Sequence, residues 1–313
     1  MINSVSVVIP VYHSAEILPA LLSRLSMVLP NVAQGYEVVL VNDGSHDKSW
    51  QIIQQLSQQY PWVVGVDLMR NYGQHNALLA GIFAAGGDVI VTMDDDLQHP
   101  PEEIPLLLDE LSKGYDVVYG TPLREQHGIW RDIASLLTKL TLQNTLGVLV
   151  ARNVGAFRAF KTQIREAFRH FQNPYVNIDV LLTWGAFSYS AVPTKHNPRH
   201  KGVSNYTFRK LLAHAINMTI GFSTFPLRFA SLMGFFFVLF GIGVFIYVVG
   251  RFFLEGGKYP GFPFLASTIA IFSGAQLFAL GIMGEYLARM YYNAIQKPTY
   301  TIRETIKNNL PTL

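Results

Sequence analysis

The sequence predicts an α/β domain with a mostly parallel sheet, followed by two helices that cross a membrane as a hairpin. Three observations lead to this fold class. Short apolar runs alternate with segments of helical spacing, polar residues follow those runs, and two long uncharged segments lie near the C-terminus. Of the 313 residues, 50% are hydrophobic and only 14% are charged, whereas a soluble domain usually carries about 25% charged residues.

The alternation of strands and helices predicts the sheet. Apolar runs predict strands at residues 5–11, 37–41, 63–68, 89–93 and 116–119, and helical spacing predicts helices at residues 15–28, 49–58, 74–84 and 101–112. Such alternating units form a mostly parallel sheet with helices on both faces. Ligands of these sheets bind outside the carboxyl ends of the strands.

Polar residues follow four of the predicted strands. They are Tyr12, Asp43, Arg70 with Asn71, and the acidic run at residues 94–96. Four polar strand ends in register indicate one binding crevice. Asp43 is suited to hydrogen bonds with a base or ribose, although an Asp-Gly turn is the ordinary alternative. Tyr12 would lie beside the same pocket, or it packs against its neighbours.

The acidic run predicts a cation site. Strand alternation would turn Asp94 and Asp96 to one side and Asp95 to the other. Adjacent carboxylates repel one another, and hard oxygen ligands suit Mg²⁺ or Mn²⁺, which also bind phosphate oxygens. Gln98 and His99 extend the polar patch. The alternative is a solvated acidic turn that caps the next helix.

Two uncharged segments predict the membrane hairpin. Residues 229–249 and 262–284 carry no charge, and a bilayer core of about 30 Å needs roughly 20 helical residues. A pair of buried helices in a soluble core is the alternative, but core helices are seldom this long without a polar face. Residues 206–225 mix basic and apolar residues, and they lie along the membrane surface or form an ordinary surface helix.

The charges around the hairpin predict its orientation. Basic residues before and after the two spans are Arg209, Lys210 and Arg228, then Arg289, Lys297, Arg303 and Lys307; the connecting loop has Arg251 and Lys258. Basic flanks favour the cytoplasm, so both termini are expected there. The N-terminus has no basic region and no apolar stretch long enough for a signal peptide.

Composition excludes other classes. A net charge of +3 is too weak to indicate nucleic acid as a partner, and the absence of cysteine excludes disulfides and thiolate metal sites. Homo-oligomer formation is compatible with the sequence.

Four motifs carry a family resemblance. PVY, VNDGS, RNYGQH and DDDLQHPPE follow successive predicted strands and resemble the GT-A fold of glycosyltransferase family 2. With RHKGVSNY before the membrane and GAQLFALGIMGEYLARMYY in the second span, the chain is similar over nearly its whole length to polyprenyl-phosphate glycosyltransferases. These include dolichol-phosphate mannose synthases and bacterial undecaprenyl-phosphate sugar transferases. RNYGQH and the motif of the second span look especially like the branch that transfers aminoarabinose or glucose to undecaprenyl phosphate.

The resemblance implies an activity, a location and an arrangement of the chain. It implies inverting transfer of a sugar, expected from a UDP-sugar, to undecaprenyl phosphate for cell-envelope glycan modification. The enzyme would lie in the inner membrane with membrane lipid as a partner. The expected parts are a GT-A domain at 1–205, an amphipathic segment at 206–226, two transmembrane helices at 227–290 and a cytoplasmic tail at 291–313. Alternatives are the use of GDP-mannose, a processive polysaccharide synthase and a non-catalytic membrane scaffold. Two spans are too few to build an export channel for a synthase.

The resemblance also implies site residues. The nucleotide site comprises Pro10, Tyr12, Asp43 and Asp94; the metal site, for Mg²⁺ or Mn²⁺, comprises Asp94, Asp96 and Gln98; the acceptor phosphate meets Arg124 and Arg131; and catalysis depends on Asp96, Arg131, Arg199 and Lys201. Two phosphate-bearing substrates require cationic residues to offset their charge, although loop cations are also ordinary surface residues. The sequence departs from the family at His13-Ser14, at Asn42 and at Asn153, where relatives often carry acidic residues.

Overall fold

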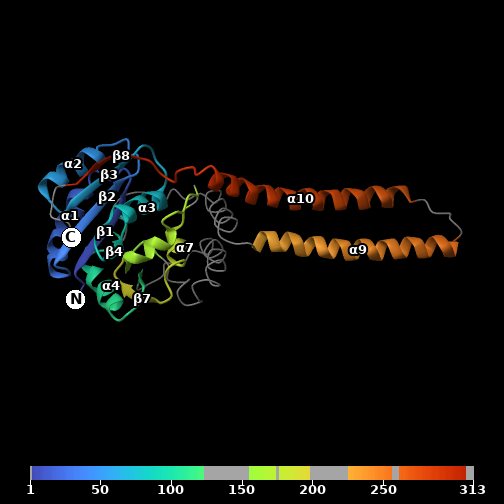
Figure 1. Ribbon diagram of the computed structural model, residues 1–313, viewed down its shortest axis with the longest axis horizontal. Helices are drawn as coiled ribbons and strands as arrows, with labels where there is room; N and C mark the ends of the chain where they lie inside the picture. The colour runs from blue at the N-terminus through green and yellow to red at the C-terminus, as the bar shows by residue number, and fades with distance from the viewer. Residues whose placement is uncertain (1, 123–154, 174–175, 198–224, 256–260, 308–313) are drawn as a thin grey trace. The chain divides into compact units, whose positions relative to one another are not determined.

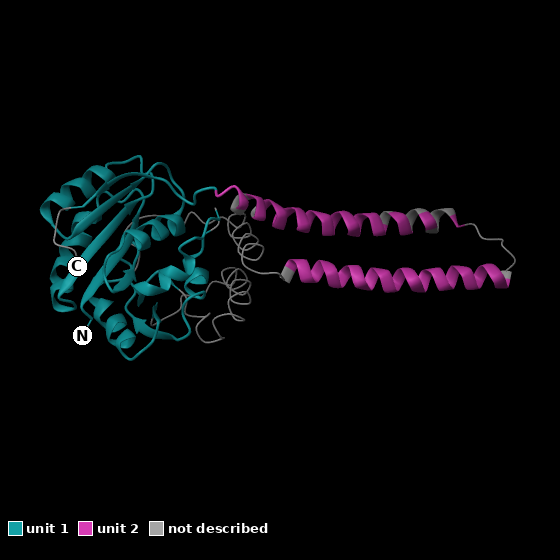
Figure 2. Cartoon of the chain, viewed as in Figure 1, with its two compact units in different colours: residues 1–212, 297–313 teal, residues 213–296 magenta. Residues whose placement is uncertain are grey.

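The computed structural model describes residues 2–122, 155–173, 176–197, 225–255 and 261–307. Two compact units make up the chain (Figure 2): residues 1–212 with 297–313, and residues 213–296. The first unit is an α/β domain, and the second contains the two long helices (Figure 1). The expected amphipathic segment lies outside the described residues as far as residue 224.

An eight-stranded sheet organises the first unit, in the order β7-β5-β6-β4-β1-β2-β3-β8. Its four central strands are parallel: β1 (Ser4–Val11), β2 (Gly35–Asn42), β3 (Val63–Leu68) and β4 (Val89–Thr92). Val7 on β1 is level with Val38 on β2 and Val91 on β4. The carboxyl ends of these strands therefore lie along one edge of the sheet.

Helices cover both faces of the sheet. On one face α1 (Leu18–Val28), α2 (Ser49–Gln59) and α4 (Ile104–Ser112) pack their leucine and isoleucine side chains against the strands. On the other face α3 (Gln74–Ala84), the 3-10 segment Thr162–Phe168 and α7 (Ile178–Leu182) do the same. Alternate residues of β1 face opposite cores, Val7 one and Val8 the other, because strand side chains alternate. The predicted three-layer α/β class is confirmed.

Further strands extend the sheet at both sides. β5 (Val117–Pro122), β6 (Arg158–Lys161) and β7 (Tyr189–Thr194) lie beyond β4, with β6 antiparallel to both β4 and β5. At the opposite edge β8 (Ile302–Ile306) pairs antiparallel with β3 (Figure 1). Of the strands beyond β4, the sequence predicted only β5. β8 lies in the segment that was expected to be a C-terminal tail.

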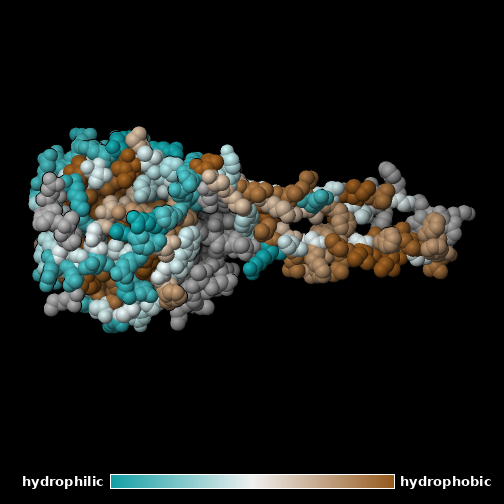
Figure 3. Space-filling view, viewed as in Figure 1, coloured by the Kyte–Doolittle hydropathy of each residue, from teal (hydrophilic) through white to brown (hydrophobic). Residues whose placement is uncertain are grey.

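The second unit contains α9 (Phe225–Glu255) and α10 (Phe262–Ala294). Each includes a stretch long and apolar enough to cross a membrane, 29 residues at Pro226–Leu254 and 18 at Ile271–Ala288, and neither stretch is buried within the molecule. Large apolar side chains cover their outer surfaces (Figure 3). A core helix of a soluble protein would bury such side chains, so the exposure favours lipid as their surroundings.

Candidate active site

A pocket of about 270 Å³ lies at the carboxyl ends of β1, β2 and β4. Its lining joins segments far apart in the sequence: Pro10, Val11, Tyr12, Asp43, Asn71, Gly73, Gln74, Asp94, Asp95 and Asp96. The polar residues of four predicted strand ends therefore meet in one crevice, as the register predicted. The roles of the individual side chains at this pocket stay predictions.

The three acidic residues lie beyond the end of β4 at Thr92, and Asp95 and Asp96 are in a turn. Asp95 accepts a hydrogen bond from the Tyr12 backbone N–H at 3.4 Å, which ties the turn to the end of β1. Asp96 accepts one from the Gln98 N–H at 3.1 Å, and Leu97 between them has φ +58°. The prediction assumed that these acids continue the strand, but β4 ends before them, so strand alternation does not orient them. Asp95 nevertheless turns toward β1.

Burial raises the pKa of Asp95, and the Asp96 charge adds to this effect. Hydrogen bonds from Ser14 and Tyr12 oppose it. Through its bond from the Tyr12 N–H, Asp95 holds the turn against the end of β1. Asp94 accepts a hydrogen bond from Gln74 Nε2 at 2.6 Å, which connects the acids to the first residue of α3.

The acidic turn fits a divalent cation that takes some of its ligands from the protein and the rest from a substrate. In the described part of the chain, no three His, Asp or Glu side chains are grouped closely enough to hold an ion by themselves. Asp94 and Asp96 nevertheless line one pocket. Mg²⁺ is usually bound through one or two carboxylates, with substrate phosphates and water completing its shell. The donor set thus suits an ion that arrives with a diphosphate.

Gln98 contributes its backbone to the site. Its N–H donates to Asp96, and its carbonyl accepts from the Asn197 N–H at 2.8 Å. These two bonds link the acidic turn to the segment after β7. The role of the Gln98 side chain as a metal ligand stays a prediction.

His99 lies beside the turn and packs its ring on Phe157, with centroids 5.2 Å apart. Burial, together with the neighbouring His196, lowers the pKa of His99 to about 4, so the imidazole is neutral at neutral pH. Its Nδ1 is buried and has no hydrogen-bond partner among the described residues.

Asp43 holds the loop that follows β3. Its carboxylate accepts hydrogen bonds from the backbone N–H groups of Tyr72 and Gly73, at 2.7 and 2.9 Å. Burial raises the pKa of Asp43, while these two backbone donors lower it and leave a net rise. Asp43 lines the pocket, as predicted, but it also fixes the pocket wall, which the sequence did not indicate.

Several predicted residues lie outside the described part of the chain. They are Arg124 and Arg131 for the acceptor phosphate, Arg199 and Lys201 of the basic loop, and Asn153. Of the residues in the pocket wall, Asn71 was expected at the crevice from its place after a predicted strand, whereas no role was predicted for Gly73 or Gln74. The motif RNYGQH after a predicted strand was the signal that pointed to this loop.

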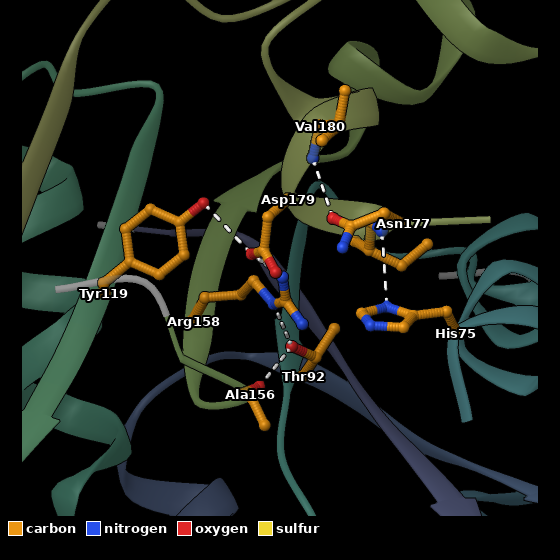
Figure 4. A network of polar contacts seen from close by, with 9 residues as sticks. His75, Thr92, Tyr119, Ala156, Arg158, Asn177, Asp179 and Val180 are labelled. Carbon is orange, nitrogen blue, oxygen red and sulfur yellow. Dashed lines mark hydrogen bonds and ion pairs between the residues drawn. The ribbon is translucent and has the colours of Figure 1, made fainter. Parts of the chain in front are cut away.

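A buried polar network joins β4, β5 and β6 to α7 (Figure 4). Arg158, 1% exposed, pairs with Asp179. Its Nε donates to Thr92 Oγ1 at 2.9 Å, and Tyr119 Oη donates to Asp179 at 3.3 Å. Thr92 in turn donates to the Ala156 carbonyl at 2.7 Å. Because Thr92 ends β4, the network fixes the strand that carries the acidic turn.

α7 is joined to α3 beside this network. Asn177 caps α7 by accepting from the Val180 N–H at 3.1 Å, and His75 Nδ1 accepts from the Ile178 N–H at 3.4 Å (Figure 4). His75 directly follows Gln74 of the pocket wall. The start of α3 is therefore held both by β2, through Asp43, and by α7.

The mostly parallel sheet, with an acidic turn and a pocket at its carboxyl edge, is the arrangement of a GT-A-like α/β fold. The model of glycosyl transferase family 2 matches residues 6–170, which is more than half of the chain. The chain belongs to this family.

Curated relatives match over nearly the full length. The undecaprenyl-phosphate 4-deoxy-4-formamido-L-arabinose transferases of Pectobacterium carotovorum and Pectobacterium atrosepticum are each 33% identical over 313 residues, covering 99% of this chain and 96% of theirs.

Solved structures share the fold of the first unit. Glucosyl-3-phosphoglycerate synthase from Mycobacterium tuberculosis, in complex with Mn²⁺, uridine diphosphate and phosphoglyceric acid, has a TM-score of 0.50 at 18% identity and covers 70% of this chain and 76% of its own. Mannosyl-3-phosphoglycerate synthase from Rubrobacter xylanophilus has a TM-score of 0.51 at 16% identity, covering 72% and 74%. At these identities the similarity establishes the fold.

Proposed function

We propose that this chain transfers a sugar from a nucleotide-sugar to undecaprenyl phosphate, and that the donor is a UDP-sugar. The observation that carries the proposal is the pocket at the carboxyl ends of β1, β2 and β4, which joins the predicted nucleotide residues to two carboxylates. The name of the full-length relatives supports the acceptor and suggests 4-deoxy-4-formamido-L-arabinose as the sugar.

The chemistry assigns roles to the parts of the pocket. A phosphate oxygen of the lipid attacks the anomeric carbon, the bond from that carbon to the nucleotide diphosphate breaks, and the configuration inverts. Asp94 and Asp96 would hold Mg²⁺ or Mn²⁺, which offsets the charge of the departing diphosphate. A phosphate monoester has a second pKa of about 6. The acceptor is therefore largely ionised at neutral pH, and the enzyme mainly has to position it.

A panel of radiolabelled donors tests the proposal. Membranes containing the full chain are incubated with undecaprenyl phosphate, Mn²⁺ and either UDP-4-deoxy-4-formamido-L-arabinose, UDP-glucose or GDP-mannose, and lipid-soluble label is counted. We expect label in the lipid fraction with a UDP-sugar. Label from GDP-mannose alone would move the chain to the dolichol-phosphate mannose synthase type. No lipid product from any donor would overturn the proposal.

We also propose that both ends of the chain lie in the cytoplasm, at the bacterial inner membrane. The first unit contains residues on both sides of the hairpin, because β8 after α10 pairs with β3 before α9. This pairing supports a hairpin with both flanks on one side of the membrane, and the basic flanking residues favour the cytoplasmic side.

A reporter tests this orientation. A fluorescent protein that folds only in the cytoplasm, fused after Leu313, is expected to fluoresce. Alkaline phosphatase fused at the same point is expected to be inactive, because it is active only on the side of the membrane opposite the cytoplasm. The opposite pair of results would contradict the orientation.

A further inference from the structure

Arg303 joins the C-terminal strand to the end of β3 by several contacts. Its Nη1 contacts Asp67 Oδ2 at 3.0 Å, and its Nη2 donates to the Met69 carbonyl at 2.8 Å. The Met69 N–H donates to the Thr301 carbonyl at 2.9 Å. Both backbone polar groups of Met69 are therefore bound by the segment that follows α10.

Asp67 connects Arg303 to β2, because its carboxylate also bonds to Asn42. Its side chain is 1% exposed, and its Oδ1 accepts a hydrogen bond from Asn42 Nδ2 at 2.7 Å. An amide at position 42 can donate to a buried carboxylate, whereas an aspartate there would repel it. The contact accounts physically for Asn42, where the family resemblance leads one to expect an acid. Arg303 supplies the compensating charge.

The ends of β2 and β3 together hold the loop at residues 70–73. Asp43, the residue after Asn42, binds the Tyr72 and Gly73 N–H groups. Gly44 has φ +64°, and a Cβ there would lie 2.3 Å from the carbonyl carbon of Arg70. The loop thus rests directly on the turn after β2, and its preceding residue is held by β8.

This loop forms one wall of the pocket. Asn71, Gly73 and Gln74 line it, and Gln74 bonds to Asp94 of the acidic turn. Two routes therefore lead from Arg303 to the pocket wall. One runs along the chain through Met69, and the other runs through Asp67, Asn42 and Asp43.

We propose that Arg303 is a positioning residue for the donor, acting through Asp67 and Met69 on the loop at residues 70–73. The inference rests on the proposed function, in which this pocket takes the nucleotide-sugar. Arg303 does not line the pocket, so its action is indirect. The C-terminal strand thereby supports the wall of the donor site from outside the pocket.

The expected effect is a selective loss of donor affinity. Arg303→Gln leaves the buried Asp67 carboxylate with the Asn42 amide alone and weakens the hold on Met69. The loop at residues 70–73 would then be less ordered before the donor binds, so we expect the donor KM to rise on the order of tenfold. The KM for undecaprenyl phosphate and kcat at saturating donor should change less than about twofold, because the acceptor and the reacting atoms are untouched.

The experiment compares three variants of the full chain in detergent. Arg303→Lys keeps the charge and should restore most of the donor KM. The control Arg169→Gln removes an arginine whose pair with Glu166 at 3.0 Å is exposed on both sides, and it should behave as wild type. Should Arg303→Gln fail to fold, Asp67→Asn removes the same ion pair at constant size and carries the same expectation.

Hydrogen exchange supplies a readout that does not depend on activity. In Arg303→Gln the amides of Tyr72 and Gly73 should exchange faster than in wild type, while those of Ile90 and Val91 in β4 should not change. Unchanged donor KM and unchanged exchange at Tyr72 and Gly73 would overturn the inference, as would equal loss of both KM values and faster exchange throughout the sheet. A wild type that forms no lipid product would instead count against the proposed function, and exchange at the loop would still decide the role of Arg303.

Discussion

Replacing Asp96 with alanine should abolish sugar transfer while the protein stays folded and in the membrane. Asp96 is half-buried, lines the pocket with Asp94 and belongs to neither apolar core, so its replacement leaves the cores unchanged. Its loss would leave the cation with one carboxylate. Removing one group that stabilises transition-state charge commonly costs about 10²- to 10³-fold in rate, and a cation held by a single carboxylate should lose at least that much.

Turnover of Asp96→Ala and of wild type with the UDP-sugar donor, across a titration of Mn²⁺ and Mg²⁺, measures this effect. Asp109→Ala is a matched control, since Asp109 is an exposed acid on α4 and lies outside this pocket. Chelation of divalent ions should silence the wild type, and added Mn²⁺ should restore it. Near-normal turnover of Asp96→Ala with either ion would rule out the metal assignment.

Replacing Asp179 with alanine should lower the free energy of unfolding by about 3–5 kcal/mol, the usual cost of leaving one partner of a buried ion pair alone. Arg158 is 1% exposed, and among the described residues its side chain would keep the bond to Thr92. Burial raises the pKa of Tyr119 well above its usual range, so its phenol remains a neutral donor that would also lose its acceptor.

Urea unfolding of the full chain in detergent, followed by tryptophan fluorescence, measures this loss. The double variant Arg158→Met/Asp179→Leu replaces the pair with apolar side chains and should recover much of the stability. If Asp179→Ala unfolded at the wild-type urea concentration, the pair would contribute nothing, and the account of how β4 is fixed would have to change.

The sheet could be predicted because its central strands are largely buried and mostly apolar. Every residue of β1 and β3 is buried, and a strand covered on both faces leaves an apolar run in the sequence. β8 has the opposite character: four of its five residues, IRETI, are exposed. An edge strand with charged side chains has no apolar signature, so its pairing with β3 could be found only from the fold.

The pocket could be predicted as a location but not as a set of contacts. The polar residues after each strand mark the edge where ligands bind. However, nothing in the run Asp94–Asp96 tells which carboxylate turns toward Tyr12, because the answer depends on where β4 ends. Asp43 likewise bonds to residues 29 and 30 positions further along the chain. The sequence does not show that these residues come close to Asp43 in the fold.

The position of β8 has a consequence for biosynthesis. A ribosome completes β1 to β7 well before it reaches residue 302, and both long helices are made in between. Until then β3 presents an open edge, which can pair with other chains. Synthesis of both long helices thus precedes synthesis of the last strand, so the sheet of the first unit is completed only at the end of translation. A fragment that stops before α9 would keep that edge open and should be prone to aggregate.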